Sequence, residues 1–269
     1  MPDGGQAAVG RPRREWKLPA AALLLALGSL AASVATGVAP TGPERPSAPA
    51  PVATEDTGTG TVVLLHGLGR TARSMEPMER ALERAGYGVV NLGYPSRELG
   101  VPELADSLAL ELERCCATAG GPVHFVTHSL GGIVLRQYLA THQLGRLGRV
   151  VMLSPPNRGT EVVDRLPDDL LVLVLGPAGA RLGTDTTDVP AQLPPVRFEL
   201  GVITGDASIN PLFSWWIPGE DDGTVSVRSA WVEGTTDFLV VPYSHTLIMH
   251  RPEVMRQVLA FLGDGAFLD

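Results

Sequence analysis

The sequence predicts an α/β fold, with a mostly parallel central sheet that carries helices on both faces. From Thr61 onward, short apolar runs alternate with segments of helical periodicity, which is the order of a parallel sheet with crossover helices. The runs are also continuously apolar, as expected of strands that are buried on both faces. A glycine turn directly after the first run fits the same architecture.

The expected elements follow one another without an internal repeat. Strands are expected at residues 62–65, 87–92, 123–127, 149–153, 198–204 and 237–241. Helices are expected at residues 74–85, 101–118, 131–142 and 251–262. The second of these helices, for example, places Leu104, Leu108, Leu112 and Cys115 on one side, which is the spacing of an amphipathic helix.

Two regions are less regular. Residues 160–196 contain the strongly apolar run Leu170–Leu175, and residues 206–222 are expected to form a loop that holds Trp215 and Trp216. The apolar run and the two tryptophans would either cap an apolar substrate cleft or belong to the ordinary core.

Composition excludes several functions. A hydrophobic content of 44% with 19% charged residues is typical of a globular protein. The formal net charge is −8, and because residues 1–17 hold four basic and two acidic residues, residues 18–269 carry −10. Such an acidic body argues against nucleic acid as a partner. Lys17 is the only lysine, which removes Schiff-base chemistry, a Ser-Lys dyad and a Walker-type phosphate loop.

The chain has two cysteines, Cys115 and Cys116, which are adjacent in an expected helix. Side chains of neighbouring residues point in different directions, so we expect two free, partly buried thiols. No ligand pattern surrounds them, so the sequence predicts no zinc site and no other metal site.

The N-terminal region resembles a targeting segment. Residues 1–17 are polar and basic, and the apolar run 18–39 follows, which predicts a cleaved export signal or a retained membrane anchor. Residues 40–60 are rich in proline and should form an extended linker. We therefore expect a globular domain at 61–269 in an exported protein, periplasmic or extracellular, or in one held at the membrane through residues 18–39.

The stretch V-H-F-V-T-H-S-L-G-G at 123–132 carries the strongest chemical pattern. An apolar run stops at Ser129 and glycines follow at once, which predicts a strand, a sharp turn and a helix that together expose the serine hydroxyl. This is the nucleophile elbow of α/β-hydrolases, written G-x-S-x-G. Thr127 stands where the first glycine is usual, and it needs more room between strand and helix. The alternative is a serine that caps a helix.

With three further motifs, the chain from about Thr61 to Phe267 resembles small bacterial α/β-hydrolase lipases and esterases. These are V-V-L-L-H-G-L-G, S-P-P-N-R-G-T, and D-D-G-T-V-S-V followed by P-Y-S-H-T, and they occur in the order that the fold requires. The resemblance implies a triad in the order nucleophile, acid, histidine.

The triad that this resemblance implies is Ser129, an aspartate between residues 205 and 225, and His245. His245 lies between the last strand and the last helix; His250 is the only other histidine that competes with it. The acid is best assigned to Asp222, which begins D-G-T-V, while Asp206 and Asp221 stay open as alternatives. The oxyanion hole would use the backbone N–H groups of Leu130 and Leu68.

The function expected from this pattern is a serine carboxylic-ester hydrolase that acts on small-molecule or lipid esters through an acyl-enzyme, with no cofactor. Two other classes stay open. An acyltransferase would be separated by titrating an acceptor that competes with water. A binding protein on a hydrolase scaffold would be excluded by fluorophosphonate labelling of Ser129, which requires an activated hydroxyl.

Overall fold

The computed structural model describes residues 60–117 and 120–269. The predicted signal or anchor at 1–39, and the predicted linker apart from Gly60, lie outside these residues. Within the two described ranges, no helix combines the length and the apolar character needed to span a bilayer.

The central sheet has six strands in the order β2-β1-β3-β4-β5-β6, and each neighbouring pair is parallel. The strands are β1 (Thr61–Leu65), β2 (Gly88–Leu92), β3 (Val123–His128), β4 (Leu147–Leu153), β5 (Leu200–Gly205) and β6 (Asp237–Val241). The central strands β1, β3 and β5 are buried along their whole length. The continuously apolar runs therefore predicted their burial on both faces correctly.

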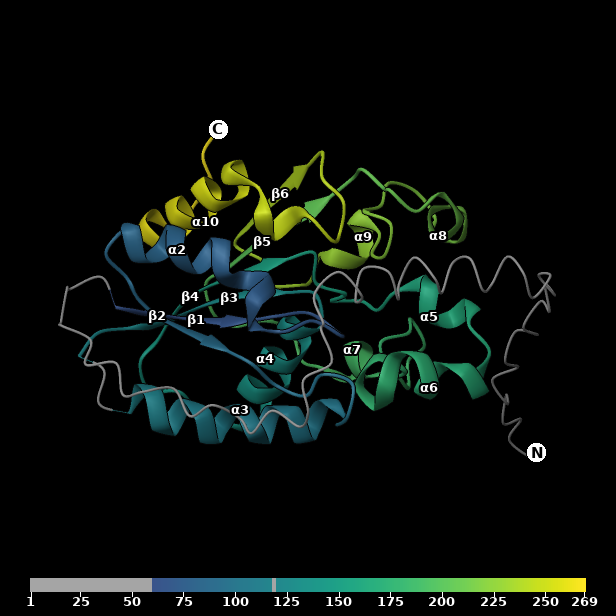
Figure 1. Ribbon diagram of the computed structural model, residues 1–269, viewed down its shortest axis with the longest axis horizontal. Helices are drawn as coiled ribbons and strands as arrows, with labels where there is room; N and C mark the ends of the chain where they lie inside the picture. Colours follow the sequence, from purple (N-terminus) through teal and green to yellow (C-terminus); the bar gives the residue numbers. More distant parts are fainter. Residues whose placement is uncertain (1–59, 118–119) are drawn as a thin grey trace, which may run out of the picture.

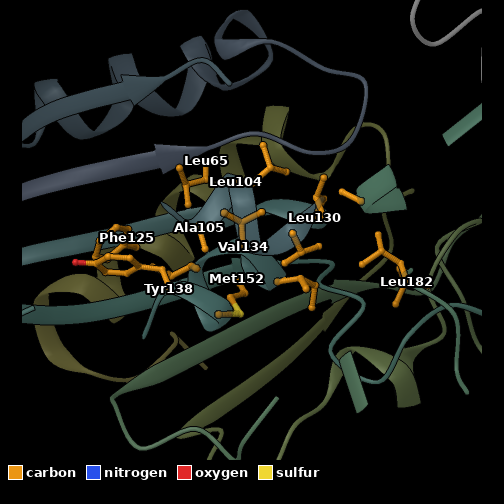
Figure 2. Close-up of a cluster of buried hydrophobic side chains, with 14 of the residues drawn as sticks. Leu65, Leu104, Ala105, Phe125, Leu130, Val134, Tyr138, Met152 and Leu182 are labelled. Carbon is orange, nitrogen blue, oxygen red and sulfur yellow. The ribbon is translucent and has the colours of Figure 1, made fainter. Parts of the chain in front are cut away.

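Helices cover both faces of the sheet, as the sequence predicted (Figure 1). The helices α2 (Glu76–Arg84) and α10 (Pro252–Asp264) lie on one face, and α3 (Val101–Cys116) and α4 (Leu130–Thr141) lie on the other. The 3₁₀ turn η1 (Ala72–Met75) leads into α2. Figure 2 shows the core on the α3–α4 side, where Phe125 and Met152 of the sheet lie among Leu104, Val134 and Tyr138 of the helices.

Shorter elements gather beyond the carboxyl ends of the strands (Figure 1). They are α5 (Glu161–Arg165), α6 (Asp168–Gly179), α7 (Val189–Gln192), α8 (Pro211–Trp216), α9 (Val227–Ala230) and the 3₁₀ turn η2 (Ile248–His250). The apolar run at 170–175 lies in α6, where Leu175 is buried and Leu173 is 73% exposed, so membership of the core accounts for only part of the run. The tryptophans divide likewise, since Trp216 is buried and Trp215 is exposed.

The expectation of a loop across residues 206–222 was wrong in its middle, because α8 forms there. The side-chain oxygen of Asn210 accepts a hydrogen bond from the N–H of Phe213 at 3.2 Å, and Pro211 occupies the first helical position. An asparagine cap followed by proline is a common helix start. The signal was therefore present in the sequence, although the helix is short.

The expectation of two free thiols was also wrong. The structure joins Cys115 and Cys116 in a disulfide at the end of α3. Their Cα atoms are 3.8 Å apart, the spacing fixed by the peptide bond. The direction of the Cα–Cβ bonds alone was a poor guide, because rotation about each Cα–Cβ bond turns the two sulfur atoms toward each other.

Candidate active site

Ser129 occupies the sharp turn between β3 and α4. Its backbone has φ 52° and ψ −121°, a conformation that residues with a side chain rarely adopt. Two backbone hydrogen bonds hold the turn: the N–H of Ser129 donates to the carbonyl of Leu153 at 2.9 Å, and the N–H of Gly132 donates to the carbonyl of Ser129 at 3.0 Å. The strain is thus maintained by the neighbouring strand and by the first turn of the helix.

Two glycines let α4 begin this close to the sheet. A Cβ atom at Gly131 would lie 2.7 Å from the carbonyl oxygen of Leu65 and 2.9 Å from that of His66. A Cβ atom at Gly132 would lie 3.3 Å from the hydroxyl oxygen of Thr127. Gly132 therefore leaves the room that Thr127 needs at the position where the elbow motif usually has glycine.

We expect Gly131→Ala to destabilise the fold by about 1–3 kcal/mol, the usual cost of forcing extra atoms into a packed interior. The obstructing atoms belong to the β1 backbone and the turn after it, and they cannot rotate away. Urea denaturation measures the loss. Gly263→Ala is the matched control, because a Cβ atom at that helical glycine would meet nothing within 4 Å and should gain up to about 1 kcal/mol from helix propensity. Equal stabilities of the two variants would contradict this account of the elbow.

His245 lies between Ser129 and Asp222 and is hydrogen-bonded to both. Its Nε2 atom is 3.0 Å from the hydroxyl oxygen of Ser129, and its Nδ1 atom is 2.8 Å from Oδ2 of Asp222. A carboxylate accepts only, so Nδ1 carries the proton and Nε2 is free to accept from the serine. All three residues are buried. The structure therefore brings together the three side chains chosen from the sequence.

Backbone groups fix Asp222. Its Oδ1 atom accepts hydrogen bonds from the N–H groups of Thr224 at 3.0 Å and Val225 at 2.8 Å, and its carbonyl accepts one from the N–H of His245 at 2.9 Å. Gly205 at the end of β5 permits the approach, since a Cβ there would lie 3.0 Å from Cβ of Asp222. The carboxylate is therefore held toward the imidazole through one oxygen and toward its own loop through the other.

The residues that the sequence left open as alternatives take no part in the hydrogen bonds between Ser129, His245 and Asp222. Asp206 is exposed and is not bonded to His245. Asp221 is buried, and its Oδ1 atom accepts from the hydroxyl of Ser214 and the N–H of Gly223, both at 2.7 Å. Asp221 therefore ties α8 to the loop of Asp222. His250 is exposed, and its Nε2 atom bonds the carbonyl of Ser74 at 3.0 Å.

The two residues expected to supply the oxyanion hole flank Ser129. Leu130 is the first residue of α4, where the helix itself offers its N–H group no acceptor. Leu68 lies in a turn closed by a 3.2 Å bond from the N–H of Arg70 to the carbonyl of Gly67. A Cβ atom at Gly67 would lie 3.2 Å from Cβ of Ser129, so this turn passes directly beside the serine.

A family model described as "Alpha/beta hydrolase family" matches residues 62–263, which is most of the chain. The chain belongs to the alpha/beta hydrolase family. No curated protein matches its sequence.

Solved structures agree with this family in fold. The mature Bacillus licheniformis lipase BlEst2 superposes with a TM-score of 0.61 at 19% identity, over 80% of this chain and 95% of that one. Phospholipase PlaB from Legionella pneumophila gives 0.57 at 15% identity, over 77% of this chain and 60% of that one. The metagenomic carboxyl esterase MGS0156 superposes with a TM-score of 0.56 at 18% identity, over 77% of this chain and 70% of that one. At these identities the likeness establishes the fold.

In this alpha/beta hydrolase, His66 and Tyr94 fix the turn beside Ser129. His66 donates through Nδ1 to the carbonyl of Gly67 at 2.9 Å and accepts from the N–H of Tyr94 at 3.3 Å. The two rings stack 4.1 Å apart, and the Tyr94 hydroxyl donates back to the carbonyl of His66. Ser96 accepts from the N–H of Gly69 at 3.0 Å. Burial lowers the pKa of His66 to about 4, so the ring is neutral at pH 7.

His128 is a further buried histidine at the elbow of this hydrolase. It donates through Nε2 to the backbone carbonyl of His245 at 2.9 Å, and its ring lies 4.9 Å from the ring of His245. Burial is the main reason that the pKa of His128 lies well below its usual range. His128 thus positions the loop of His245 as a neutral donor. In the sequence, His128 stands out only as the neighbour of Ser129, and no sequence pattern indicates a role for Tyr94.

Arg136 explains the role of Asn157 in the motif S-P-P-N-R-G-T. This buried arginine on α4 donates to the backbone carbonyl of Asn157 at 2.9 Å and to its side-chain oxygen at 3.2 Å. It also donates to the carbonyls of Leu193 and Pro194. Burial lowers its pKa to about 10. The asparagine therefore serves to hold the helix that follows Ser129.

An open pocket of about 460 Å³ lies between α5 and α8, and none of the site residues predicted from the sequence lines it. Its walls come from Glu161, Asp164, Arg165, Trp215, Trp216, Ile217 and Pro218. Among the described residues, no group of His, Cys, Asp and Glu side chains is arranged to hold a metal ion.

Proposed function

We propose that this protein is a serine carboxylic-ester hydrolase of the lipase or esterase type. The observation that carries the proposal is the pair of hydrogen bonds from Ser129 through His245 to Asp222 at a strained turn. This arrangement can activate a hydroxyl, because the imidazole is held in the tautomer that accepts the serine proton.

The proposed mechanism has two acyl-transfer steps. The Ser129 hydroxyl gives its proton to Nε2 of His245 as its oxygen attacks the ester carbonyl, and the N–H groups of Leu130 and Leu68 bind the oxyanion of the tetrahedral intermediate. His245 then protonates the leaving alcohol, which departs and leaves an acyl-serine. Water attacks this acyl group as one of its protons passes to His245. His245 then returns this proton to the Ser129 oxygen as the bond to the acyl carbon breaks, which releases the carboxylic acid and restores the serine. Asp222 stabilises the imidazolium in both steps.

The structural neighbours support the choice of substrate class. Among the solved structures with the same fold, one is named a lipase, one a phospholipase and one a carboxyl esterase. A lipase and a carboxyl esterase cleave carboxylic esters, which is the reaction that an elbow serine with a histidine partner serves.

A fluorophosphonate probe and a panel of p-nitrophenyl esters of graded chain length test this proposal on the full chain. We expect the probe to label Ser129 and the protein to hydrolyse at least one chain length. Failure of both would refute a hydrolase. Labelling without hydrolysis, combined with acyl transfer to an added alcohol, would identify an acyltransferase instead.

We also propose that the catalytic domain, residues 61–269, acts outside the cytoplasm. The basic start and the apolar run at 18–39 support this. We expect the full chain to be found in the envelope or medium, either cleaved near Ala35 or Ala39 or retained in the membrane, and a chain that starts at Thr54 to keep full activity on a water-soluble ester. N-terminal sequencing and fractionation distinguish cleavage from retention. A soluble cytoplasmic protein that still begins at Met1 would refute both.

A further inference from the structure

Arg70 lies between the two loops that carry the candidate site. It ends the turn that begins at Gly67 beside Ser129, and its Nη2 atom lies 3.5 Å from the carbonyl oxygen of Thr246, the residue after His245. The guanidinium therefore lies against the backbone of the loop that carries His245, and it takes no part in the hydrogen bonds that join Ser129, His245 and Asp222.

The guanidinium of Arg70 is half-buried and has few partners within the described part of the protein. A guanidinium has five N–H donors, and the contact with Thr246, at the long limit of a hydrogen bond, is the one found for it within residues 60–117 and 120–269. The ion pairs of that part of the chain use other arginines. Burial lowers the pKa of Arg70, and no described carboxylate acts to raise it.

Arg136 shows how this fold satisfies a buried arginine that has only a structural role. Its guanidinium donates to four oxygen atoms, on Asn157, Leu193 and Pro194. Arg70 has no such set of acceptors around it in the described part of the chain. Unlike Nε of Arg136, no side-chain nitrogen of Arg70 is both fully buried and without a partner. Its remaining N–H groups therefore reach solvent and are open to an anionic group that arrives with the substrate.

Arg70 lies close enough to His66 and His128 for its charge to influence the pKa of both rings. Burial is the main cause of the lowered pKa of each ring, and the positive charge of Arg70 contributes to both shifts. Both rings are therefore neutral at pH 7 and offer no negative charge to balance the guanidinium.

We propose that Arg70 binds an anionic group of the substrate, a carboxylate or phosphate close to the scissile ester. A guanidinium fork binds such groups through two parallel charge-assisted hydrogen bonds. This inference rests on the proposed ester hydrolysis and adds to it a preference for esters that carry negative charge near the reacting carbonyl.

Two matched substrate pairs test the preference. Monoethyl glutarate and ethyl pentanoate differ in a terminal carboxylate, and dihexanoyl phosphatidic acid and dihexanoylglycerol, both below their critical micelle concentrations, differ in a phosphate. Hydrolysis is followed in a pH-stat. We expect the natural chain to favour the anionic member of at least one pair, and Arg70→Gln to lower kcat/KM for that member about tenfold or more beyond its effect on the neutral member. The pair that responds tells a soluble carboxylate from a lipid phosphate.

Two further variants separate charge recognition from a structural role. Arg70→Lys keeps the charge and should restore part of the preference. Arg84→Gln removes an exposed arginine from the far end of α2 and should change both members of a pair by the same factor. Equal losses on charged and neutral esters in Arg70→Gln, or no preference in the natural chain for either pair, would overturn the proposal.

A binding measurement keeps this inference distinct from the proposed function. Calorimetric titration of monoethyl glutarate onto the Ser129→Ala chain needs no turnover, and we expect binding to weaken about tenfold or more when Arg70→Gln is added. If the natural chain hydrolyses no ester, the proposed function fails and this titration alone decides whether Arg70 binds anions. Unchanged affinity in the double variant would refute the anion site even in an active hydrolase.

Discussion

Ser129→Ala is expected to abolish ester hydrolysis, with a loss of about a million-fold in kcat, as found when the serine is removed from a comparable triad. The hydroxyl bonds only to His245 in the described structure, and the turn is held by backbone groups that alanine retains. The fold should therefore survive. Initial rates on a p-nitrophenyl ester measure the loss, and circular dichroism and the Tm report the fold.

Ser154→Ala is the matched control for this experiment. Ser154 also follows a central strand, is fully buried and has a positive φ of 47°, but its hydroxyl has no hydrogen-bond partner among the described residues. Removing that hydroxyl should change activity less than about tenfold. A Ser129→Ala protein that kept more than about a hundredth of the natural activity would show that another group is the nucleophile.

The parts of the structure that the sequence predicted are those encoded locally. Each buried strand, such as β1 or β3, is a continuous apolar run, and the elbow is a serine between such a run and two glycines. The assignment of His245 needed only its place between the last strand and the last helix. Local pattern therefore predicted the architecture and the three side chains that the structure brings together.

Contacts between distant segments could not be predicted in the same way. Tyr94 stacks on His66 from another strand end, and His128 supports His245 across 117 positions of sequence. Thr127 departs from the glycine of the elbow motif, and only the structure shows that Gly132 in α4 leaves the space that the threonine side chain occupies. Nothing in the sequence distinguishes Arg136 from Arg70. In the structure the guanidinium of Arg136 donates to four oxygen atoms, whereas that of Arg70 has one contact among the described residues.

The choice among the acids shows the same limit. Asp206, Asp221 and Asp222 all stood at positions that the triad order permits, and D-G-T-V favoured Asp222 by resemblance alone. Oδ2 of Asp222 faces the imidazole because Thr224 and Val225 hold its other oxygen, whereas Asp221 is turned toward Ser214. The backbone of one loop thus directs two adjacent carboxylates to different partners, Asp222 to His245 and Asp221 to Ser214.

Asp222→Asn should therefore lower kcat about ten-thousand-fold, the size of the same change in a serine protease. The amide can still accept from Thr224 and Val225 through its oxygen, which places its NH₂ group against Nδ1 of His245. An amide NH₂ can only donate there, so the ring must carry its proton on Nε2 and cannot take the proton of Ser129. Stopped-assay rates at pH 7 measure the loss.

Asp221→Asn and Asp206→Asn are the controls that make this prediction specific. Asparagine at position 221 keeps an oxygen that accepts from Ser214 and Gly223, and the side chain of Asp206 is exposed and is not bonded to His245. Each should retain activity within about tenfold of the natural chain. An inactive Asp206→Asn protein beside an active Asp222→Asn protein would move the acid to the end of β5 while leaving Ser129 and His245 in their roles. Equal and small losses in all three would mean that the imidazole needs no carboxylate to hold its tautomer.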